Sequence, residues 1–385
     1  MKRIPILIAA CFIFLSAAAQ GRRMPDNVSL AYDAYFRYCF DNREFSASEG
    51  QYLNSETVHL VRLAPTLGLE YRSPDGLRHR LMAGADIVKD MGSGEDFTSE
   101  LLCWYGLEMR RGRYTFSGRA GIFPRRYSVF GSESAALRGK DMVPSVFASD
   151  KARIYDGNME GLLLQMHSRS GYVEAGLDWM GKYGSMRRER FQVFTYGRFD
   201  LSGGFSLGWA ASVYHYANAV EYKGVVDNIM FSPFVLWSRR WEDFGYMSKL
   251  SWLQGIHQDR IRKTGLELAP GGLLSQRLDW KSLHLLSDTY YGTGQMPYYD
   301  GYDAGGFLYG SDLYAGCPFY KIHPSSEDWK EPGFYERAEF FWNPVSSGVA
   351  DIRLGMVAHF NAEGFCGWQQ KLGVVFDLDR LIRKR

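Results

Sequence analysis

Residues 57–87 read TVHLVRLAPTLGLEYRSPDGLRHRLMAGADI and contain the clearest structural pattern in the sequence. From Val61 to Tyr71 every second residue is apolar, while the residues between them include Arg62 and Glu70. Such alternation with a period of two is typical of a strand with two different faces. The segment 73–76 contains Pro, Asp and Gly, each of which favours a turn for its own backbone reason. The stretch therefore predicts a β-hairpin with one apolar face and one polar face.

Charges on the polar face of this hairpin pair across the predicted turn. Arg62 is expected near Asp86, and Glu70 near Arg80. Cross-strand pairs of opposite charge contribute about 0.2–1 kcal/mol each, so they set the register more than the stability. A soluble sandwich buries its apolar face, whereas a strand in a membrane barrel turns that face toward lipid. Alternation alone does not separate these two folds.

The lengths of the connections do separate them. About sixteen alternating segments lie between residues 28 and 377, an even number typical of outer-membrane barrels. Short connections are predicted at 73–76, 110–113, 169–171, 202–204, 241–244, 279–282 and 343–348. Longer ones fall between them, at 46–55, 89–97, 123–158, 181–189, 217–228, 257–264 and 292–332. The last connection, at 361–364, is short where this alternation predicts a long one. Short periplasmic turns and long extracellular loops distinguish bacterial outer-membrane barrels, so we predict an all-β, antiparallel, up-and-down transmembrane barrel.

The N-terminus has the pattern of a targeting segment. After a short basic start, residues 4–15 are apolar and residues 16–19 are small, which predicts a cleaved signal peptide over residues 1–20. Beyond it the sequence has no run of 18 apolar residues that would predict a transmembrane helix. We therefore assign residues 21–378 to the barrel and residues 379–385 to a basic periplasmic tail.

Composition and motifs argue against several classes of function. The 385 residues include 45 Lys+Arg and 43 Asp+Glu, and this balance argues against a nucleic-acid partner. The eight histidines are dispersed, and neither a metal-binding pair nor a Gly-x-Ser-x-Gly elbow is present. We expect no cofactor, no metal and no enzymatic activity. A barrel enzyme of the lipase or lipid A deacylase type stays open as an alternative, with His59 and Ser55 as its one candidate pair.

The segment 123–158 interrupts the alternation for far longer than an ordinary loop of about four to six residues. Arg119 precedes this segment and Arg169 follows it. We expect the segment to fold into the lumen as the third long loop and narrow it; the alternative is a flap on the outer surface. Its candidate constriction residues are charged, namely Arg125, Arg126, Arg138, Asp141, Asp150, Arg153 and Asp156.

The polar phase of the strands predicts the wall that faces this segment. A barrel of about sixteen strands leaves an aqueous lumen, and we expect its wall to be lined by Arg62, Arg80, Asp86, Trp104, Glu108, Arg119 and Arg169. Arg119 is expected beside Trp104, where a cation–π contact would contribute about 0.5–2 kcal/mol. An alternative is that these charges pair with each other and only solvate the lumen.

Two later stretches also carry predictions. Residues 292–332 combine many Tyr, Phe and Trp residues with carboxylates, a composition found on sugar-binding surfaces and also in loops that simply pack. Residues 270–272 read Pro-Gly-Gly inside a predicted strand, which predicts a bulge or kink.

The order of these features resembles the general porins, in which a long third loop folds into a barrel of sixteen strands. Residues 155–165, YDGNMEGLLLQ, and 176–181, GLDWMG, resemble uncharacterised outer-membrane barrels of the Bacteroidota. One departure is that Phe376 is followed by Asp377 and the basic tail, whereas such barrels commonly end on an aromatic residue.

The resemblance implies a multi-pass protein of the Gram-negative outer membrane, surrounded by outer-membrane lipid. It also implies passive diffusion of small polar solutes or ions, and homotrimers. A surface ligand-binding barrel with a plugged lumen remains an alternative, beside the barrel enzyme.

Overall fold

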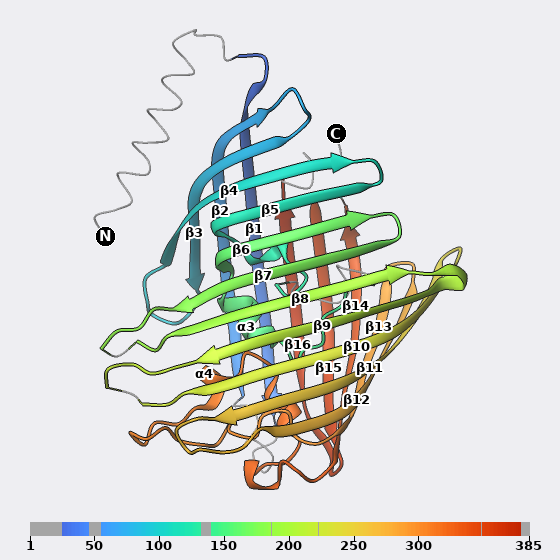
Figure 1. The fold of residues 1–385 in the computed structure, drawn as a ribbon. Coiled ribbons are helices and arrows are strands. Elements are labelled where there is room, and N and C mark those ends of the chain that lie inside the picture. Colours follow the sequence, from blue (N-terminus) through green and yellow to red (C-terminus); the bar gives the residue numbers. More distant parts are fainter. Residues whose placement is uncertain are drawn as a thin grey trace.

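In the computed structural model the chain forms one closed barrel of sixteen antiparallel strands, in which the first strand pairs with the last (Figure 1). The structure describes residues 25–45, 55–131, 140–185, 187–221, 223–347 and 349–378. The predicted fold class is confirmed. The signal peptide at 1–20 and the tail at 379–385 lie outside the described residues and stay predictions. No helix in the described part of the chain is long and apolar enough to cross a membrane.

Each strand pairs with its neighbours in sequence. The strands are β1 (Val28–Phe45), β2 (Glu56–Arg72), β3 (Arg78–Asp90), β4 (Thr98–Arg111), β5 (Tyr114–Pro124), β6 (Asn158–Ser168), β7 (Gly171–Gly181), β8 (Arg190–Asp200), β9 (Phe205–Tyr216), β10 (Val226–Trp241), β11 (Phe244–Asp259), β12 (Glu267–Trp280), β13 (Leu283–Gly292), β14 (Gly333–Ser346), β15 (Ala350–Asn361) and β16 (Gly364–Asp377).

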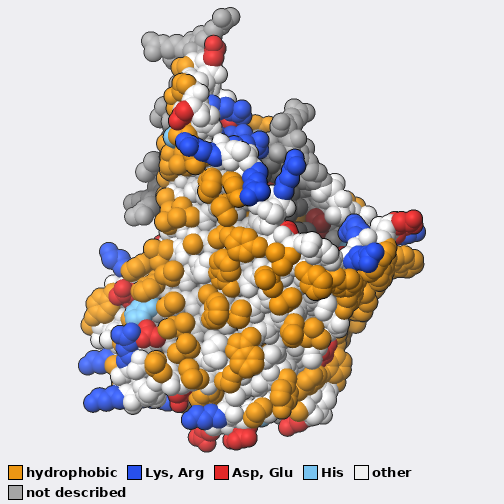
Figure 2. Space-filling model, turned by 45° about the vertical axis from the view of Figure 1, so that its right-hand side comes forward, with side chains coloured by type: hydrophobic (Ala, Val, Ile, Leu, Met, Phe, Trp, Pro, Cys, Tyr) orange, Lys and Arg blue, Asp and Glu red, His pale blue; other side chains and the backbone are white. Residues whose placement is uncertain are grey.

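The alternation of the sequence becomes the two faces of the barrel wall. Leu81 on β3 is 60% exposed on the outside, whereas Arg62 on the neighbouring β2 is 4% exposed and faces the lumen. Figure 2 shows hydrophobic side chains covering the visible wall, with charged side chains gathered toward its ends. This distribution suits a wall that meets hydrocarbon outside and a polar interior inside.

The connections differ in length at the two ends of the barrel, as predicted. One end carries the short turns and the other carries the long connections, with the tight 362–363 turn between β15 and β16 as the exception. Gly364 has φ +125° at this turn, a backbone conformation that a side chain would strain.

The predicted bulge at 270–272 is wrong. The pairing of β11 with β12 continues through this segment without a register shift. A Cβ on Gly271 would lie only 2.2 Å from the hydroxyl of Tyr290, so the glycine makes room for a ring inside the lumen. Register shifts occur instead at Trp179/Gly181, Trp342/Val345 and His359/Phe360.

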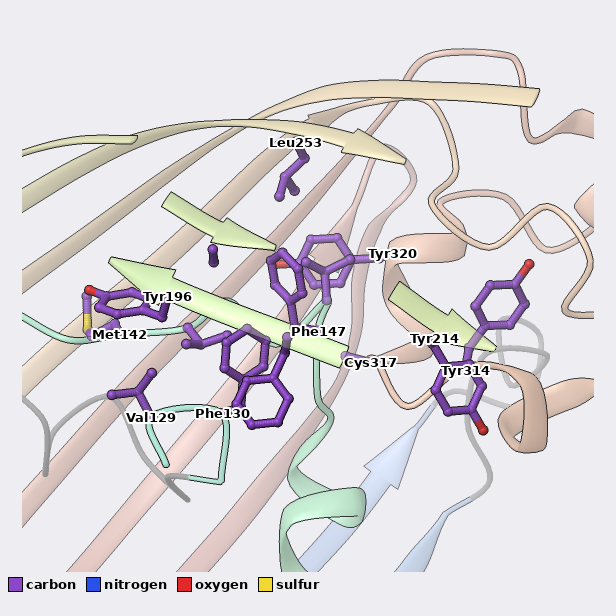
Figure 3. Close-up of a cluster of buried hydrophobic side chains, with 14 of the residues drawn as sticks. Val129, Phe130, Met142, Phe147, Tyr196, Tyr214, Leu253, Tyr314, Cys317 and Tyr320 are labelled. Atoms are coloured by element: carbon purple, nitrogen blue, oxygen red, sulfur yellow. The ribbon is translucent and has the colours of Figure 1, made fainter. Parts of the chain in front are cut away.

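Two long connections fill much of the lumen. The third of the long connections joins β5 to β6 and is called the third connection below. It covers residues 125–157 and contains η1 (Arg125–Tyr127) and α3 (Asp150–Tyr155). The seventh of the long connections joins β13 to β14 and is called the seventh connection below. It covers residues 293–332 and contains α4 (Gly310–Leu313), η3 (Pro318–Lys321) and η4 (Ser326–Asp328). Side chains of both connections belong to one buried hydrophobic cluster together with inward-facing side chains of the wall (Figure 3). The only other helix in the described residues is η2 (Ser202–Gly204), in a short turn.

Candidate functional site

The third connection enters the lumen through two adjacent arginines. The Arg125 guanidinium lies 2.6 Å from Asp178 on β7. The Arg126 guanidinium pairs with Asp33 on β1, and the Tyr127 hydroxyl donates to the same carboxylate at 3.0 Å. Because β1 and β7 lie on different sides of the barrel, the two arginines hold the start of the connection across the lumen.

The middle of the third connection is fixed to the wall by hydrogen bonds. Glu174 on β7 accepts from the Ser128 hydroxyl at 2.7 Å and from the Val129 amide at 3.0 Å. Further along, the Asp141 carboxylate lies 2.7 Å from Arg198 on β8. The buried amine of Lys249 on β11 donates to a main-chain carbonyl of the connection, that of residue 142.

The end of the third connection is tied to the strands that close the barrel. Asp150, at the start of α3, lies 3.0 Å from Arg337 on β14 and 2.5 Å from Lys371 on β16. Burial by itself would raise the pKa of this carboxyl, but Lys371 and Arg337 hold its pKa well below the usual range. Asp150 is therefore a fixed negative charge between two cations.

The seventh connection packs against the third through its backbone. The Ser149 amide donates to the carbonyl of Ala315 at 2.6 Å, and the Cys317 amide donates to the carbonyl of Ser145 at 2.8 Å. Gly316 lies between these two bonds, where a Cβ would come within 2.0 Å of a carbonyl oxygen of the third connection. The two connections therefore form one body inside the barrel.

Aromatic side chains join this body to the wall in two separate places, at β8 and at β14 and β15. Phe130 of the third connection lies 4.6 Å, centroid to centroid, from Phe194 on β8. Phe319 of the seventh connection stacks on His359 of β15 at 4.6 Å and on Tyr335 of β14 at 5.2 Å. Figure 3 shows Phe130, Tyr196 and Tyr320 among the buried side chains of this cluster.

Small cavities remain beside the third connection. One of about 30 Å³ lies among mostly apolar side chains near the joint with the seventh connection. Another of about 20 Å³ lies between β1, β2 and the third connection. A third, of about 80 Å³, lies between α3 and strands β1 and β14–β16. Since a cavity needs about 10–15 Å³ of such space to hold one water molecule, each of these is large enough for water.

The cavity of about 80 Å³ has a strongly charged lining. Asp150 lines it together with side chains from the strands that meet where the barrel closes. The charged side chains of its wall are Arg37, Asp41, Glu339, Asp351, Arg353 and Lys371. These six residues are not among the constriction residues predicted from the sequence, although four of them, Arg37, Glu339, Asp351 and Arg353, have apolar neighbours on both sides. The missing information was the pairing of β1 with β16, which brings both ends of the chain to one place.

The predicted wall charges on β2–β4 pair with one another. Arg62 lies 3.2 Å from Asp86, and Arg80 lies 2.7 Å from Glu70. Glu108 lies 3.4 Å from an arginine on the neighbouring strand, Arg78. The Asn158 amide at the end of the third connection donates to Asp86 at 2.8 Å. These charges therefore form a paired network against which the third connection rests.

The predicted contact between Arg119 and Trp104 takes another form. The register pairs Arg119 with Gly106 and Trp104 with Gly121, two residues away. The Arg119 guanidinium lies 4.2 Å above the ring of Tyr127, and this ring meets Trp104 edge-on at 5.8 Å. Tyr127 thus joins both side chains to the third connection, which the sequence alone could not show.

The other predicted constriction residues lie in different surroundings. Arg169 is exposed in the β6–β7 turn, at the rim with the short turns, and this corrects its placement beside the constriction. Asp156 pairs within the connection, 2.6 Å from Arg125. Arg153 is buried and donates to a main-chain carbonyl of the connection at 3.2 Å. Arg138 lies outside the described residues.

The candidate catalytic pair does not form. The His59 ring bonds the Tyr38 hydroxyl at 2.9 Å, while the Ser55 hydroxyl accepts from the Phe45 amide at 2.9 Å. Among the described residues no cluster of His, Cys, Asp or Glu could hold a metal ion. His59 and Ser55 therefore bond to other residues and not to each other.

No protein family matches this sequence, and no curated protein matches it. Solved structures do resemble the fold. OmpT, an outer membrane protein of Vibrio cholerae, aligns over 92% of this chain and 98% of its own, with a TM-score of 0.52 and 10% identity. A trimer form of OmpT gives 0.52 over 91% of this chain and 100% of its own, also at 10% identity. OpdL of Pseudomonas aeruginosa gives 0.50 over 91% and 99%, at 10% identity.

These likenesses concern the fold. Together with the closed barrel of sixteen strands and its apolar outer wall, they show a β-barrel of the bacterial outer membrane, which crosses the membrane many times. The resemblance to barrels of the Bacteroidota stays a prediction.

Proposed function

We propose that this protein is a narrow outer-membrane channel through which small polar solutes or ions diffuse passively along the charged side of the third connection. The observation that carries the proposal is the difference between the two sides of that connection. One side is packed with aromatic rings against β8 and its neighbours, and the other side faces a charged cavity of about 80 Å³.

The charged side supplies what a path for polar solutes needs. Asp41, Glu339 and Asp351 lie on the same wall as Arg37, Arg353 and Lys371. A low-dielectric barrel wall strengthens the field between charges of opposite sign. A path lined by both signs orients polar solutes and replaces part of the water around an ion.

The size of the cavities limits what passes. Cavities of about 20 Å³ and 80 Å³ follow the wall from β2 to β16 on both sides of α3. Spaces as small as these suit ions and very small polar solutes. Larger solutes require the third connection to move, and its ion pairs with β1, β7, β8, β14 and β16 resist such movement.

The measurement that tests the proposal is ion conductance of the purified full chain in a planar bilayer. In a salt gradient, Glu339→Gln and Asp351→Asn should each shift the reversal potential toward anion preference, because each removes a negative charge from the path. Arg353→Gln should shift it the opposite way. Lys281→Gln, which changes an exposed side chain in a short turn, is the matched control and should change nothing.

The same measurement separates the alternatives. A barrel that inserts and folds but carries no current under any of these conditions would be a plugged, ligand-binding barrel. An equal shift by the Lys281→Gln control would assign the selectivity to surface charge. We propose a non-enzymatic role because His59 and Ser55 are engaged with other partners.

We also propose a homotrimer in a lipid environment. The support is that OmpT of Vibrio cholerae, whose barrel resembles this one, has a trimer form. Native mass spectrometry of the detergent-solubilised chain would report the number of copies directly, and a single copy under conditions that keep the barrel folded would contradict this proposal.

A further inference from the structure

A cavity of about 810 Å³ opens at the end of the barrel that carries the long connections. It lies between the β7–β8 connection, the end of β9 and part of the seventh connection. Its lining includes the charged side chains of Lys182, Arg187, Arg190 and Asp312 and the rings of Tyr183 and Phe307. Its volume falls within the range of about 300–1,000 Å³ that is usual for sites of small organic ligands.

One wall of this cavity is held in place by Asp303. Its carboxylate accepts from the Gly305 amide at 2.8 Å and from the Phe307 amide at 3.0 Å, and it also pairs with Arg188. The Arg188 guanidinium in turn lies 4.8 Å above the ring of Tyr216 on β9. This buried pair fixes the turn that carries Phe307, so the wall of the cavity is preorganised.

The cavity carries an excess of positive charge. Arg190 has Asp312 as its neighbour at 4.0 Å, and that carboxylate is 72% exposed, so water screens the pair. Lys182 and Arg187 make no ion pair with any described residue, and both are exposed. Arg188 is neutralised by its own carboxylate partner. Three cations therefore face one weakly held carboxylate, a combination that attracts anions.

Aromatic rings lie beside these cations. Tyr183 is 54% exposed and Phe307 is 49% exposed on the cavity lining. Arginine and lysine are the side chains that bind phosphate oxygens, while an exposed ring offers a flat apolar surface to the body of a ligand. A free phosphate ion would leave most of the volume unfilled.

We propose that this cavity binds a phosphorylated sugar. Lys182, Arg187 and Arg190 would hold the phosphate, and the rings of Tyr183 and Phe307 would contact the apolar face of the sugar. The hydroxyl groups of the sugar keep their water because the cavity is open to solvent. Such a group could come from a free sugar phosphate or from the head group of a glycolipid in the surrounding membrane, and the chemistry is the same for both. The site is independent of whether the lumen conducts.

The test is equilibrium dialysis of the folded full chain in detergent, with radiolabelled glucose 6-phosphate, glucose and inorganic phosphate as probes. Glucose 6-phosphate should bind at one saturable site, about tenfold more tightly than either of the other two, because they each lack half of the contacts. The double variant Lys182→Gln/Arg187→Gln should weaken its binding by about tenfold or more. Phe307→Ala should weaken glucose 6-phosphate and leave inorganic phosphate unchanged.

The matched control is Arg111→Gln/Arg113→Gln, which removes two exposed arginines from a short turn at the opposite end. This control should bind glucose 6-phosphate as the unchanged chain does. Absence of saturable binding, equal weakening by the control, or equal affinity for inorganic phosphate would each overturn the proposal.

A second arm identifies the source of the ligand. The chain is extracted from membranes, and its bound lipid is analysed by mass spectrometry. A glycolipid that accompanies the unchanged chain, is lost in the Lys182→Gln/Arg187→Gln variant and is displaced by glucose 6-phosphate would identify the head group as the ligand. Saturable binding of glucose 6-phosphate to a chain that carries no such lipid would identify the free solute.

Discussion

The third and seventh connections both enter the lumen, but they are held there by different forces. The third connection is rich in charge and is attached to the wall mainly through ion pairs, such as those of Arg126, Asp141 and Asp150. The seventh is rich in aromatic residues and is attached mainly through stacked rings, such as Phe319 on His359. A barrel can therefore use either chemistry to hold a long loop inside, and the charged loop lies beside a cavity that is lined by charges of both signs.

The largest expected effect is that of removing the third connection. Excision of residues 128–148 should leave a folded barrel, because the strands of the barrel pair with each other and not with this segment. Single-channel conductance and the size cut-off for neutral solutes should both increase, since the lumen of a barrel of this size is an aqueous channel when nothing fills it. Heat-modifiable migration on a gel reports folding. Unchanged conductance would assign the constriction to the seventh connection.

The next effect separates the aromatic attachment from the charged one. Phe319→Ala removes a ring that is 2% exposed and stacks on two wall residues. The free energy of unfolding should fall by about 3–5 kcal/mol, as for other buried Phe→Ala changes, measured by urea denaturation of the detergent-solubilised chain. Ion selectivity should stay the same. The matched control is Phe307→Ala at a ring that is 49% exposed; if it cost as much, the ring stacking would not be what holds the seventh connection.

A smaller effect is expected for the charged attachment. Asp150→Asn removes the shared partner of Arg337 and Lys371, and should lower the free energy of unfolding by about 1.5–3 kcal/mol. Single-channel recordings should show more frequent transitions to higher conductance, because the end of α3 is released from β14 and β16. Glu331→Gln, an exposed carboxylate in the described part of the seventh connection, is the control. Steady recordings from Asp150→Asn would show that other contacts hold this end.

The smallest effect concerns acid. The folded-state pKa of Asp150 is held well below its usual value of about 3.9. Its contribution to stability is therefore present above pH 4 and is lost only as the pH falls through the depressed pKa. The conductance of the unchanged chain should be the same at pH 7 and pH 5. An acid-induced rise in that range that disappears in Asp150→Asn would contradict the assigned charge state.

Several features of the fold could be predicted because they depend on local repetition. The period of two fixed which side chains face outward, as at Leu81 and Arg62, since successive residues of a strand point to opposite sides. The contrast between short and long connections fixed the topology. The bulge predicted at 270–272 was wrong because Gly271 leaves space for the ring of Tyr290, which comes from another strand.

The barrel, its sixteen strands, its two faces and the entry of a charged third loop into the lumen could thus be predicted from local patterns in the sequence. The contacts between charges could not, because they form only when the whole chain has folded. Asp150 binds Lys371, which is 221 residues away, and Tyr127 takes the place that we expected Trp104 to occupy beside Arg119. Such contacts depend on the pairing of β1 with β16 and on the packing of two loops in the same lumen. Neither the pairing nor the packing produces a repeating pattern in the sequence. Periodicity reports the direction of a side chain, whereas its partner depends on how the whole chain closes.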